Sequence, residues 1–326
     1  MPRITGIRKD LRQGFRNLHR YWSLELEDKI RYSNRLIEKV LENHSKPVVC
    51  WSGGKDSTVL LHLILKYAPD IPVIYNDTGV EFPETRSFVK QIASEWNLSL
   101  FVAKPNPGET FWNCVKMYGW PMFGKAQALS IEQARRTGNI RSSLSAFERT
   151  LALEGVSISS RCCEITRERP TKRVESEMGA NAKFLGIMAS ESRSRMRLFV
   201  DHGDYYFVRR YFGRRRGMWK ASPISVWQEN DIWEYHSLYN LPHCSLYDMG
   251  HQRNGCWPCA MGIKFGQLGR LRISHPKLFR YLILRTELGT QIIKAKLALD
   301  TNSNYEFSKL KRESILEAYP CFFDRF

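Results

Sequence analysis

Six consecutive residues combine the groups that a phosphate site requires: Ser52, Gly53, Gly54, Lys55, Asp56 and Ser57. The two glycines permit positive φ and let backbone N–H groups approach an anion closely. The lysine supplies a mobile positive charge, and the two serines supply hydroxyl donors. This segment therefore predicts a loop that binds nucleotide phosphates and carries the catalytic groups.

The segments on either side of the loop support this interpretation. Residues 47–51 form a short apolar run typical of a buried strand, and residues 58–65 are typical of a helix packed on it. A helix that begins at the loop adds unpaired N–H donors and the positive end of a dipole. The spacing of the glycines differs from that of a Walker-type loop. Asp56 would either help to hold a metal ion or orient the loop.

A second polar segment, residues 75–85, follows the next expected strand, at residues 71–75. Ligands of open α/β sheets bind at the carboxyl ends of the strands, so Asp77 and Thr78 are predicted to face the nucleotide. The same residues also suit a simple turn, because Thr78 and Gly79 can reverse the chain before a helix that begins at Pro83.

Four cysteines are candidate metal ligands: Cys162, Cys163, Cys256 and Cys259. A Cys-x-x-Cys turn presents two thiolates to one metal centre, and a distant pair can complete four-thiolate coordination. Adjacent cysteines diverge and rarely bind one zinc ion together, which favours a [4Fe–4S] cluster over zinc, with a redox or unliganded role as a further alternative. The other cysteines are predicted to be packing residues or free thiols: Cys50, Cys114, Cys244 and Cys321.

Hydrophobic periodicity indicates an α/β protein with a parallel sheet. Residues 1–45 are predicted to form a basic N-terminal arm with one or two helices, and residues 46–225 a core in which strands and helices alternate. Residues 226–326 are predicted to be mainly helical around the Cys256–Cys259 turn.

The chain of 326 residues has 50 Lys and Arg against 33 Asp and Glu, a net charge of +17. This charge indicates a polyanionic partner, although a merely basic soluble protein is the alternative. Cations gather in residues 3–20 and again in residues 193–220, where aromatic residues alternate with them; some of these aromatics are expected to be core strand residues. No apolar run is long enough to cross a bilayer and no signal sequence is evident, so a cytoplasmic location without membrane contact is expected.

Several motifs in order resemble the phosphoadenosine-phosphosulfate (PAPS) reductase family of the PP-loop ATP pyrophosphatases. They occupy residues 52–57, 77–85, 162–163, 186–195, 223–235 and 247–259. The resemblance implies a PP-loop core (an adenine nucleotide alpha hydrolase-like fold) that binds ATP with Mg²⁺. It also implies that Cys162, Cys163, Cys256 and Cys259 carry a [4Fe–4S] cluster. Three further residues would then lie beside the nucleotide: Glu191, Ser192 and Arg195.

Two departures separate this chain from the reductases. The C-terminal segment around Cys321 lacks the Glu-Cys-Gly-type motif that carries their nucleophile, and the intact Ser52–Ser57 loop has the form expected of an ATP-cleaving enzyme. Met188 also stands where the family often has arginine. The chain resembles more closely the DNA phosphorothioation branch, of the DndC and SspD type. Members of that branch hydrolyse ATP to AMP and pyrophosphate and act with a cysteine desulfurase to place sulfur in the DNA backbone. Three alternatives remain: a sulfonucleotide reductase that makes sulfite, a tRNA thiolation enzyme, and a non-catalytic DNA-binding subunit.

Overall fold

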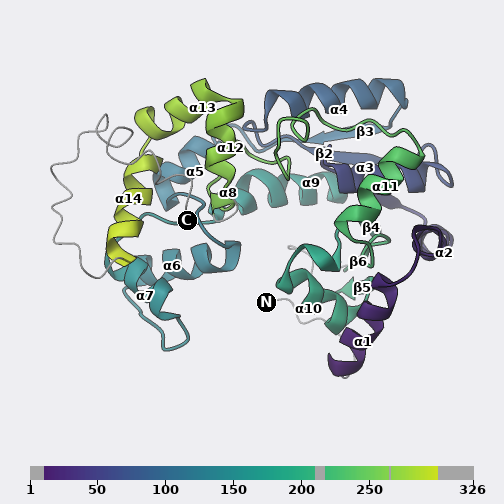
Figure 1. Cartoon of the computed structure of the whole chain (residues 1–326), viewed down its shortest axis with the longest axis horizontal. Coiled ribbons are helices and arrows are strands. Elements are labelled where there is room, and N and C mark those ends of the chain that lie inside the picture. Colours follow the sequence, from purple (N-terminus) through teal and green to yellow (C-terminus); the bar gives the residue numbers. More distant parts are fainter. Residues whose placement is uncertain (1–10, 210–216, 264–265, 300–326) are drawn as a thin grey trace. The chain divides into compact units, whose positions relative to one another are not determined.

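The structure, a computed structural model, describes residues 11–209, 217–263 and 266–299 (Figure 1). The chain forms two compact units, each made of segments that are distant in sequence. Unit 1 comprises residues 1–77, 83–104 and 170–247, and unit 2 comprises residues 78–82, 105–169 and 248–326. The predicted boundaries after residues 45 and 225 do not coincide with this division and stay a prediction.

Unit 1 is built on a six-stranded sheet in the order β3-β2-β1-β4-β6-β5. Four neighbouring pairs are parallel, and β5 is antiparallel to β6 at the edge. The predicted α/β class with a mostly parallel sheet is therefore confirmed. The strands are β1 (Pro47–Trp51), β2 (Val73–Asn76), β3 (Leu100–Ala103), β4 (Ala182–Leu185), β5 (Tyr205–Val208) and β6 (Met218–Ala221).

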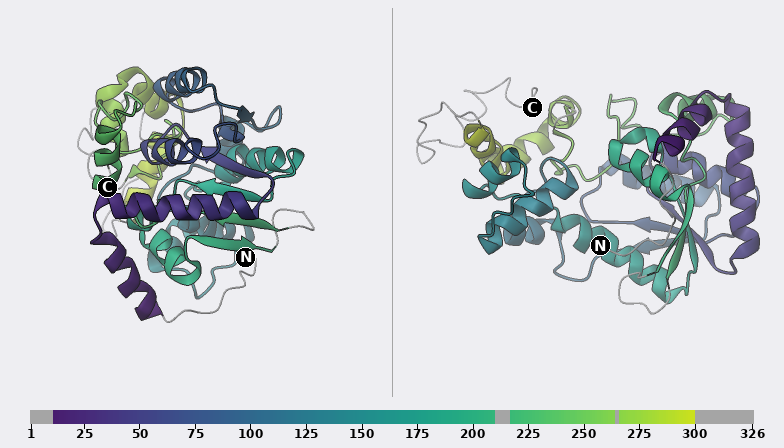
Figure 2. Two further views of the ribbon diagram at one scale, coloured as in Figure 1. Left: turned by 90° about the vertical axis from the view of Figure 1, so that its right-hand side faces the viewer. Right: turned by 90° about the horizontal axis from the view of Figure 1, so that it is seen from below.

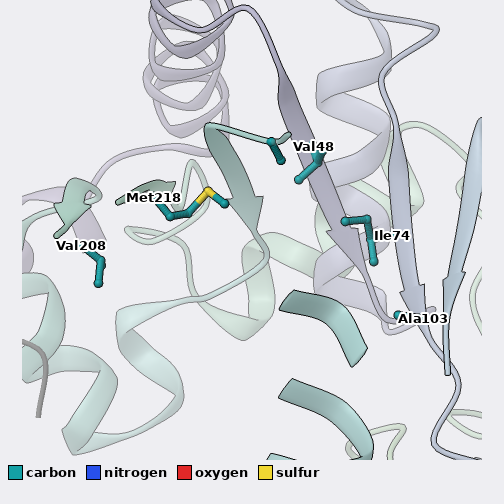
Figure 3. Close-up of a cluster of buried hydrophobic side chains, with 6 residues drawn as sticks. Val48, Ile74, Ala103, Val208 and Met218 are labelled. Atoms are coloured by element: carbon teal, nitrogen blue, oxygen red, sulfur yellow. The ribbon is translucent and has the colours of Figure 1, made fainter. Parts of the chain in front are cut away.

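Helices cover both faces of this sheet. Side chains of successive strand residues point to opposite sides, so apolar residues of one strand can pack against helices on both faces. On one face, Val48, Ile74 and Met218 belong to a buried apolar cluster, against which Val174 of α9 (Arg169–Glu177) packs (Figure 3). On the other face, the ring of Trp51 lies 6.3 Å from that of Phe88 in α4 (Pro83–Glu95).

The helix that follows the loop, α3 (Lys55–Leu65), is almost entirely buried, since it packs on β1 and also contacts α2 (Leu26–Asn43) and α11 (Glu229–Leu238). A buried ion pair joins the latter two helices, with 2.8 Å between Lys29 Nζ and Asp231 Oδ2. Figure 2 shows the long helix α2 running beside the strands. Unit 1 also contains α1 (Leu11–Trp22), the short 3-10 helix η2 (Ala189–Glu191) and α10 (Arg193–His202).

Unit 2 is mainly helical in its described part, with a core that includes Leu151, Ile158, Leu268 and Ile292. Its helices are α5 (Phe111–Tyr118), α6 (Lys125–Thr137), α7 (Ala146–Leu153), α8 (Arg161–Cys163), η1 (Glu164–Glu168), α12 (Gln267–Ser274), α13 (Pro276–Arg280), η4 (Tyr281–Arg285) and α14 (Leu288–Leu299). Across residues 11–209, 217–263 and 266–299, no helix has the length and apolar character needed to cross a membrane.

Candidate functional site

The Ser52–Ser57 loop lies where the order of the sheet reverses. It follows β1, which has β2 on one side and β4 on the other, and open α/β sheets bind ligands at such a switch point. Gly53 has a φ of 70°, a conformation that side chains with a Cβ rarely adopt. Gly54 is the N-cap of α3 and has no side chain that could accept a hydrogen bond from the first N–H groups of this helix.

Hydroxyl groups hold the loop in its curved form. Ser52 Oγ and Ser57 Oγ are 3.0 Å apart, and the Ser57 hydroxyl donates to the Gly54 carbonyl at 2.9 Å. The Gly54 N–H in turn donates to Ser52 Oγ at 3.3 Å. The two serines predicted as catalytic groups therefore also shape the loop.

Lys55 is buried, with only 4% of its surface exposed, and its ammonium group is held by two carboxylates. Nζ lies 3.0 Å from Asp56 Oδ1 and 3.1 Å from Glu229 Oε2. The backbone N–H of Lys55 donates to the Tyr247 hydroxyl at 3.0 Å. An incoming phosphate would use the same ammonium and the same N–H, so Glu229 and Tyr247 lie where its oxygens would bind.

Sequence reasoning did not select Glu229 or Tyr247 as site residues. Glu229 lies in the motif at residues 223–235 and Tyr247 in the motif at residues 247–259. Membership of these motifs is the sequence feature that could have identified both as site residues. Tyr247 is 192 residues from Lys55 in the chain, so only the fold could bring the two together.

Gly186, just after β4, is a third residue of the site that was not predicted. A Cβ added there would lie 2.9 Å from Ser57 Cα and 3.2 Å from Ser57 N. Real Cβ atoms do not approach a backbone this closely, so only glycine lets the end of β4 pack against the first turn of α3.

The described contacts of the predicted pair Asp77 and Thr78 differ, and a role beside a nucleotide stays a prediction for both. Asp77 follows the last residue of β2, and its Oδ1 lies 3.2 Å from Arg86 Nη2. Thr78 belongs to unit 2, where its N–H donates to Glu81 at 2.9 Å and its Oγ1 lies 3.5 Å from Cys256 Sγ. Thr78 is therefore in contact with Cys256, one of the predicted metal ligands.

Glu191, Ser192 and Arg195 lie together where α10 begins. Glu191 accepts the Met188 N–H at 3.1 Å and pairs with the Arg195 guanidinium. Ser192 caps the helix by accepting the Arg195 N–H at 3.3 Å. These contacts organise the chain after β4; a role beside a nucleotide stays a prediction.

The four predicted metal ligands all belong to unit 2, and their thiols influence one another. A hydrogen bond from Cys162, aided by Lys125, lowers the pKa of Cys163 against the opposing effect of burial, whereas the same bond and burial raise the pKa of Cys162. Burial raises the pKa of Cys256 to about 11 and also raises the pKa of Cys259, which the charges of Cys256 and Cys163 raise further.

The arrangement of these thiols does not by itself support the predicted cluster. Among the residues that the structure describes, no group of three or more His, Cys, Asp or Glu side chains is placed to hold a metal ion. The four-thiolate donor set has the right chemistry for iron and sulfur, and the cluster stays a prediction.

The predicted basic clusters are only partly within the described residues. Arg3, Arg8 and Lys9 lie outside them, as do residues 210–216 and Cys321. In the second cluster, the ring of Tyr205 stacks on that of Trp219 with centroids 4.6 Å apart. These two aromatics belong to neighbouring strands and are half-buried, so they pack on each other without being core residues.

A cavity of about 480 Å³ opens at the other end of the sheet, lined by residues that include Pro47, Val48, Pro72 and Met178. Pro47 begins β1, whereas the loop follows its last residue, Trp51. This cavity is therefore separate from the phosphate loop.

Known proteins are similar in sequence to most of this chain. The model of the phosphoadenosine phosphosulfate reductase domain matches residues 46–261. An uncharacterized protein of Methanocaldococcus jannaschii is 28% identical over 247 residues, which are 74% of this chain and 42% of that protein. The phosphoadenosine 5'-phosphosulfate reductase of Proteus mirabilis is 28% identical over 204 residues, 63% of this chain and 66% of that enzyme.

The chain spans about half the length of the first relatives that it matches, 42% and 54% of two Methanocaldococcus jannaschii proteins. Among solved structures, a phosphoadenylyl-sulfate reductase from Candida auris aligns with a TM-score of 0.46 and 17% identity, over 78% of this chain and 98% of that one. That structural similarity is too low to bear on function. The match of the domain model to more than half of the sequence shows that the chain belongs to the phosphoadenosine phosphosulfate reductase domain family.

Proposed function

We propose that this protein binds ATP at the Ser52–Ser57 loop and cleaves it to AMP and pyrophosphate, transferring the adenylyl group to a nucleic-acid backbone for sulfur incorporation. The observation that carries the proposal is the environment of Lys55. Its ammonium is buried and its N–H begins a helix at the switch of the sheet, and both groups suit phosphate oxygens.

The residues of the loop can supply the electrostatic part of this reaction. An acceptor oxygen attacks the α-phosphorus, the bond to the bridging oxygen breaks, and pyrophosphate leaves with the electron pair. Lys55 and the loop N–H groups would neutralise the charge that develops on pyrophosphate. Mg²⁺ would further neutralise the phosphates when bound, and Asp56 fits as its ligand, because Mg²⁺ commonly keeps its waters and takes one or two carboxylates.

We further propose DNA as the acceptor, with tRNA as the alternative, and a cysteine desulfurase as the partner that supplies sulfur. Adenylation converts a non-bridging phosphate oxygen into a leaving group. The terminal sulfur of the desulfurase persulfide then attacks the phosphorus and displaces AMP, and a thiol reductant cleaves the resulting S–S bond to leave sulfur on the phosphate. The net charge of +17 supports a polyanionic acceptor. Cys162, Cys163, Cys256 and Cys259 are the proposed [4Fe–4S] ligands, and no step above depends on the cluster. Iron and sulfide analysis of anaerobically purified protein tests it.

The similarity to PAPS reductases favours a second candidate function, reduction of a sulfonucleotide to sulfite. That reaction requires a thiol nucleophile and releases no pyrophosphate. The two candidates therefore differ in a product that can be measured directly.

The test is to incubate anaerobically purified protein with ATP and Mg²⁺, with and without DNA, and to measure AMP and pyrophosphate. We expect both products from the unmodified protein and at least 100-fold less from Lys55→Ala, because loss of a preorganised charge typically costs about 2.7–4 kcal/mol. Lys66→Ala, an exposed position at the end of the same helix, is the control that retains activity. Absence of both products, together with sulfite formed from a sulfonucleotide and a thiol donor, would support the reductase instead.

A second measurement identifies the acceptor. Mass spectrometry of digested host DNA and tRNA should detect phosphorothioate dinucleotides in DNA from cells with the intact protein and none with Lys55→Ala. Thiolated bases in tRNA, without backbone sulfur in DNA, would show that the tRNA alternative is correct.

A further inference from the structure

A basic helical segment of unit 2 lies apart from the cationic clusters noted above. Residues 267–285, which form α12, α13 and η4, contain five cations and no acidic residue. The cations are Arg270, Arg272, Lys277, Arg280 and Arg285.

Part of this segment presents its cations on one exposed face. Lys277, Arg280, Tyr281 and Arg285 are exposed, and Tyr281 lies four residues from both Lys277 and Arg285, close to one helical turn. The intervening residues Phe279, Leu282 and Ile283 are buried in the core of unit 2. We call Lys277, Arg280, Tyr281 and Arg285 the basic stripe. Within the described part of the chain, none of its three cations forms an ion pair.

Aromatic rings stand within this positive surface. Tyr281 is 46% exposed, and its ring centroid lies 5.9 Å from that of Trp112 and 6.3 Å from that of Trp257. The two tryptophan rings are 5.7 Å apart and each is half-buried. The three rings contact one another, and Tyr281 presents an aromatic surface beside Arg280 and one turn before Arg285.

We propose that the basic stripe, with Trp112 and Trp257 behind it, binds single-stranded nucleic acid. The cations would bind successive phosphates, and the exposed ring of Tyr281 would stack on an unpaired base, an interaction worth about 1–3 kcal/mol per base. An acidic protein would use the cations but would gain little from an aromatic ring among them. A duplex would present its phosphates but no free base face.

This inference rests on the proposed function for its substrate class and adds the location of the strand. Trp257 stands between Cys256 and Cys259 in the chain, so a strand on the basic stripe would lie beside the cysteine motif. The cysteines and the bound strand would then belong to the same unit.

The test is fluorescence anisotropy with a labelled single-stranded oligodeoxynucleotide over a series of salt concentrations. We expect the combined variant Lys277→Ala, Arg280→Ala, Arg285→Ala to bind more weakly and to lower the slope of log K against log salt by about 2, since each phosphate contact contributes about 0.7 for single strands. Tyr281→Ala should weaken binding by about 5- to 150-fold, and Tyr281→Phe should retain binding, because phenylalanine keeps the stacking ring.

The matched control replaces three exposed cations of unit 1 and changes the net charge equally: Arg31→Ala, Arg35→Ala and Lys90→Ala. Melting curves that match the unmodified protein exclude misfolding, and Lys55→Ala should lose ATP cleavage while retaining strand binding, which separates the two proposals. The inference is wrong if the stripe variant and the control lose the same affinity. It is equally wrong if Tyr281→Ala binds like the unmodified protein, or if polyglutamate competes as well as the strand.

Discussion

Lys55 is the residue on which the proposed chemistry depends, and its neighbours explain how the free protein keeps a buried ammonium group. Asp56 and Glu229 both pair with it, at 3.0 and 3.1 Å. Asp56 belongs to the loop, whereas Glu229 comes from α11 and has a side chain that is 57% exposed. Glu229 can therefore move into solvent when a phosphate takes its place.

This competition predicts the effect of Glu229→Gln on nucleotide binding. Removing the carboxylate leaves the ammonium free for the phosphates, so we expect ATP to bind a few-fold more tightly; exposed ion pairs are worth less than about 1 kcal/mol. Calorimetric titration with a non-hydrolysable ATP analogue and Mg²⁺ measures the change. Glu234→Gln, an exposed position on the same helix, is the control. Weaker binding to Glu229→Gln would show that Glu229 supports the nucleotide instead of competing with it.

The thiols of the adjacent cysteines predict an unequal reactivity in metal-free protein. The hydrogen bond from Cys162 lowers the pKa of Cys163, so Cys163 becomes a thiolate at a pH where an ordinary thiol is still protonated. Its alkylation by iodoacetamide should therefore reach its plateau rate at lower pH than that of Cys256, whose pKa burial raises to about 11. Peptide mass spectrometry across a pH series gives both profiles. Equal profiles for the two cysteines would contradict the described contact.

At the level of elements, the phosphate loop depends on two strands and not on β1 alone. β1 leads into the loop, and the chain after β4 supports the first turn of α3 through Gly186. The order of the sheet places these strands side by side, although more than 120 residues separate them in sequence. A substitution after β4 should therefore act on the loop.

Gly186→Ala tests this dependence. Its Cβ would lie 2.9 Å from Ser57 Cα, so the loop must shift, and we expect ATP cleavage to fall by at least 10-fold while the sheet still forms. Gly255→Ala, where the added Cβ meets nothing within 4 Å, is the matched control. Circular dichroism checks folding and pyrophosphate release measures activity. Full activity in Gly186→Ala would show that the loop tolerates the displacement.

At the level of the whole molecule, the excess of cations is distributed over several parts of the chain. The predicted N-terminal arm contains Arg3, Arg8 and Lys9, the stretch around residues 193–220 contains more, and the basic stripe of unit 2 adds Lys277, Arg280 and Arg285. A single polyanionic chain that contacts several of these regions would show a steep dependence on salt.

The contribution of the arm is separately measurable. Arg3→Ala, Arg8→Ala and Lys9→Ala together should weaken nucleic-acid binding and reduce the salt slope by about 2, if each cation contacts a phosphate of a single strand. Cleavage of ATP without nucleic acid should not change, because the described contacts of Lys55 come from Asp56, Glu229 and Tyr247. An unchanged salt slope would mean that the arm does not contact the strand.

Local patterns were sufficient for much of the architecture. The apolar run at 47–51, the helix after it and the helix that begins at Pro83 were predicted from short segments, and the structure confirms all three. Tyr205–Val208 also forms a strand, in the stretch where some aromatic residues were expected to be strand residues. These elements can be predicted because the pattern of apolar residues along a short segment indicates whether it forms a helix or a strand and which residues are buried.

The partners of the predicted residues could not be derived in this way. The residues near Lys55 in sequence do not identify Glu229 or Tyr247 as its partners, and those near Thr78 do not identify Cys256. Contacts between distant segments produce no periodic pattern in the sequence from which they could be predicted. The amino-acid sequence alone determined the phosphate loop, the α/β class and the candidate cysteines, since each follows from residue types and short spacings. Only the tertiary structure decided that Glu229 and Tyr247 contact Lys55, that Gly186 packs against Ser57 and that Thr78 lies beside Cys256, because those contacts depend on how distant segments pack.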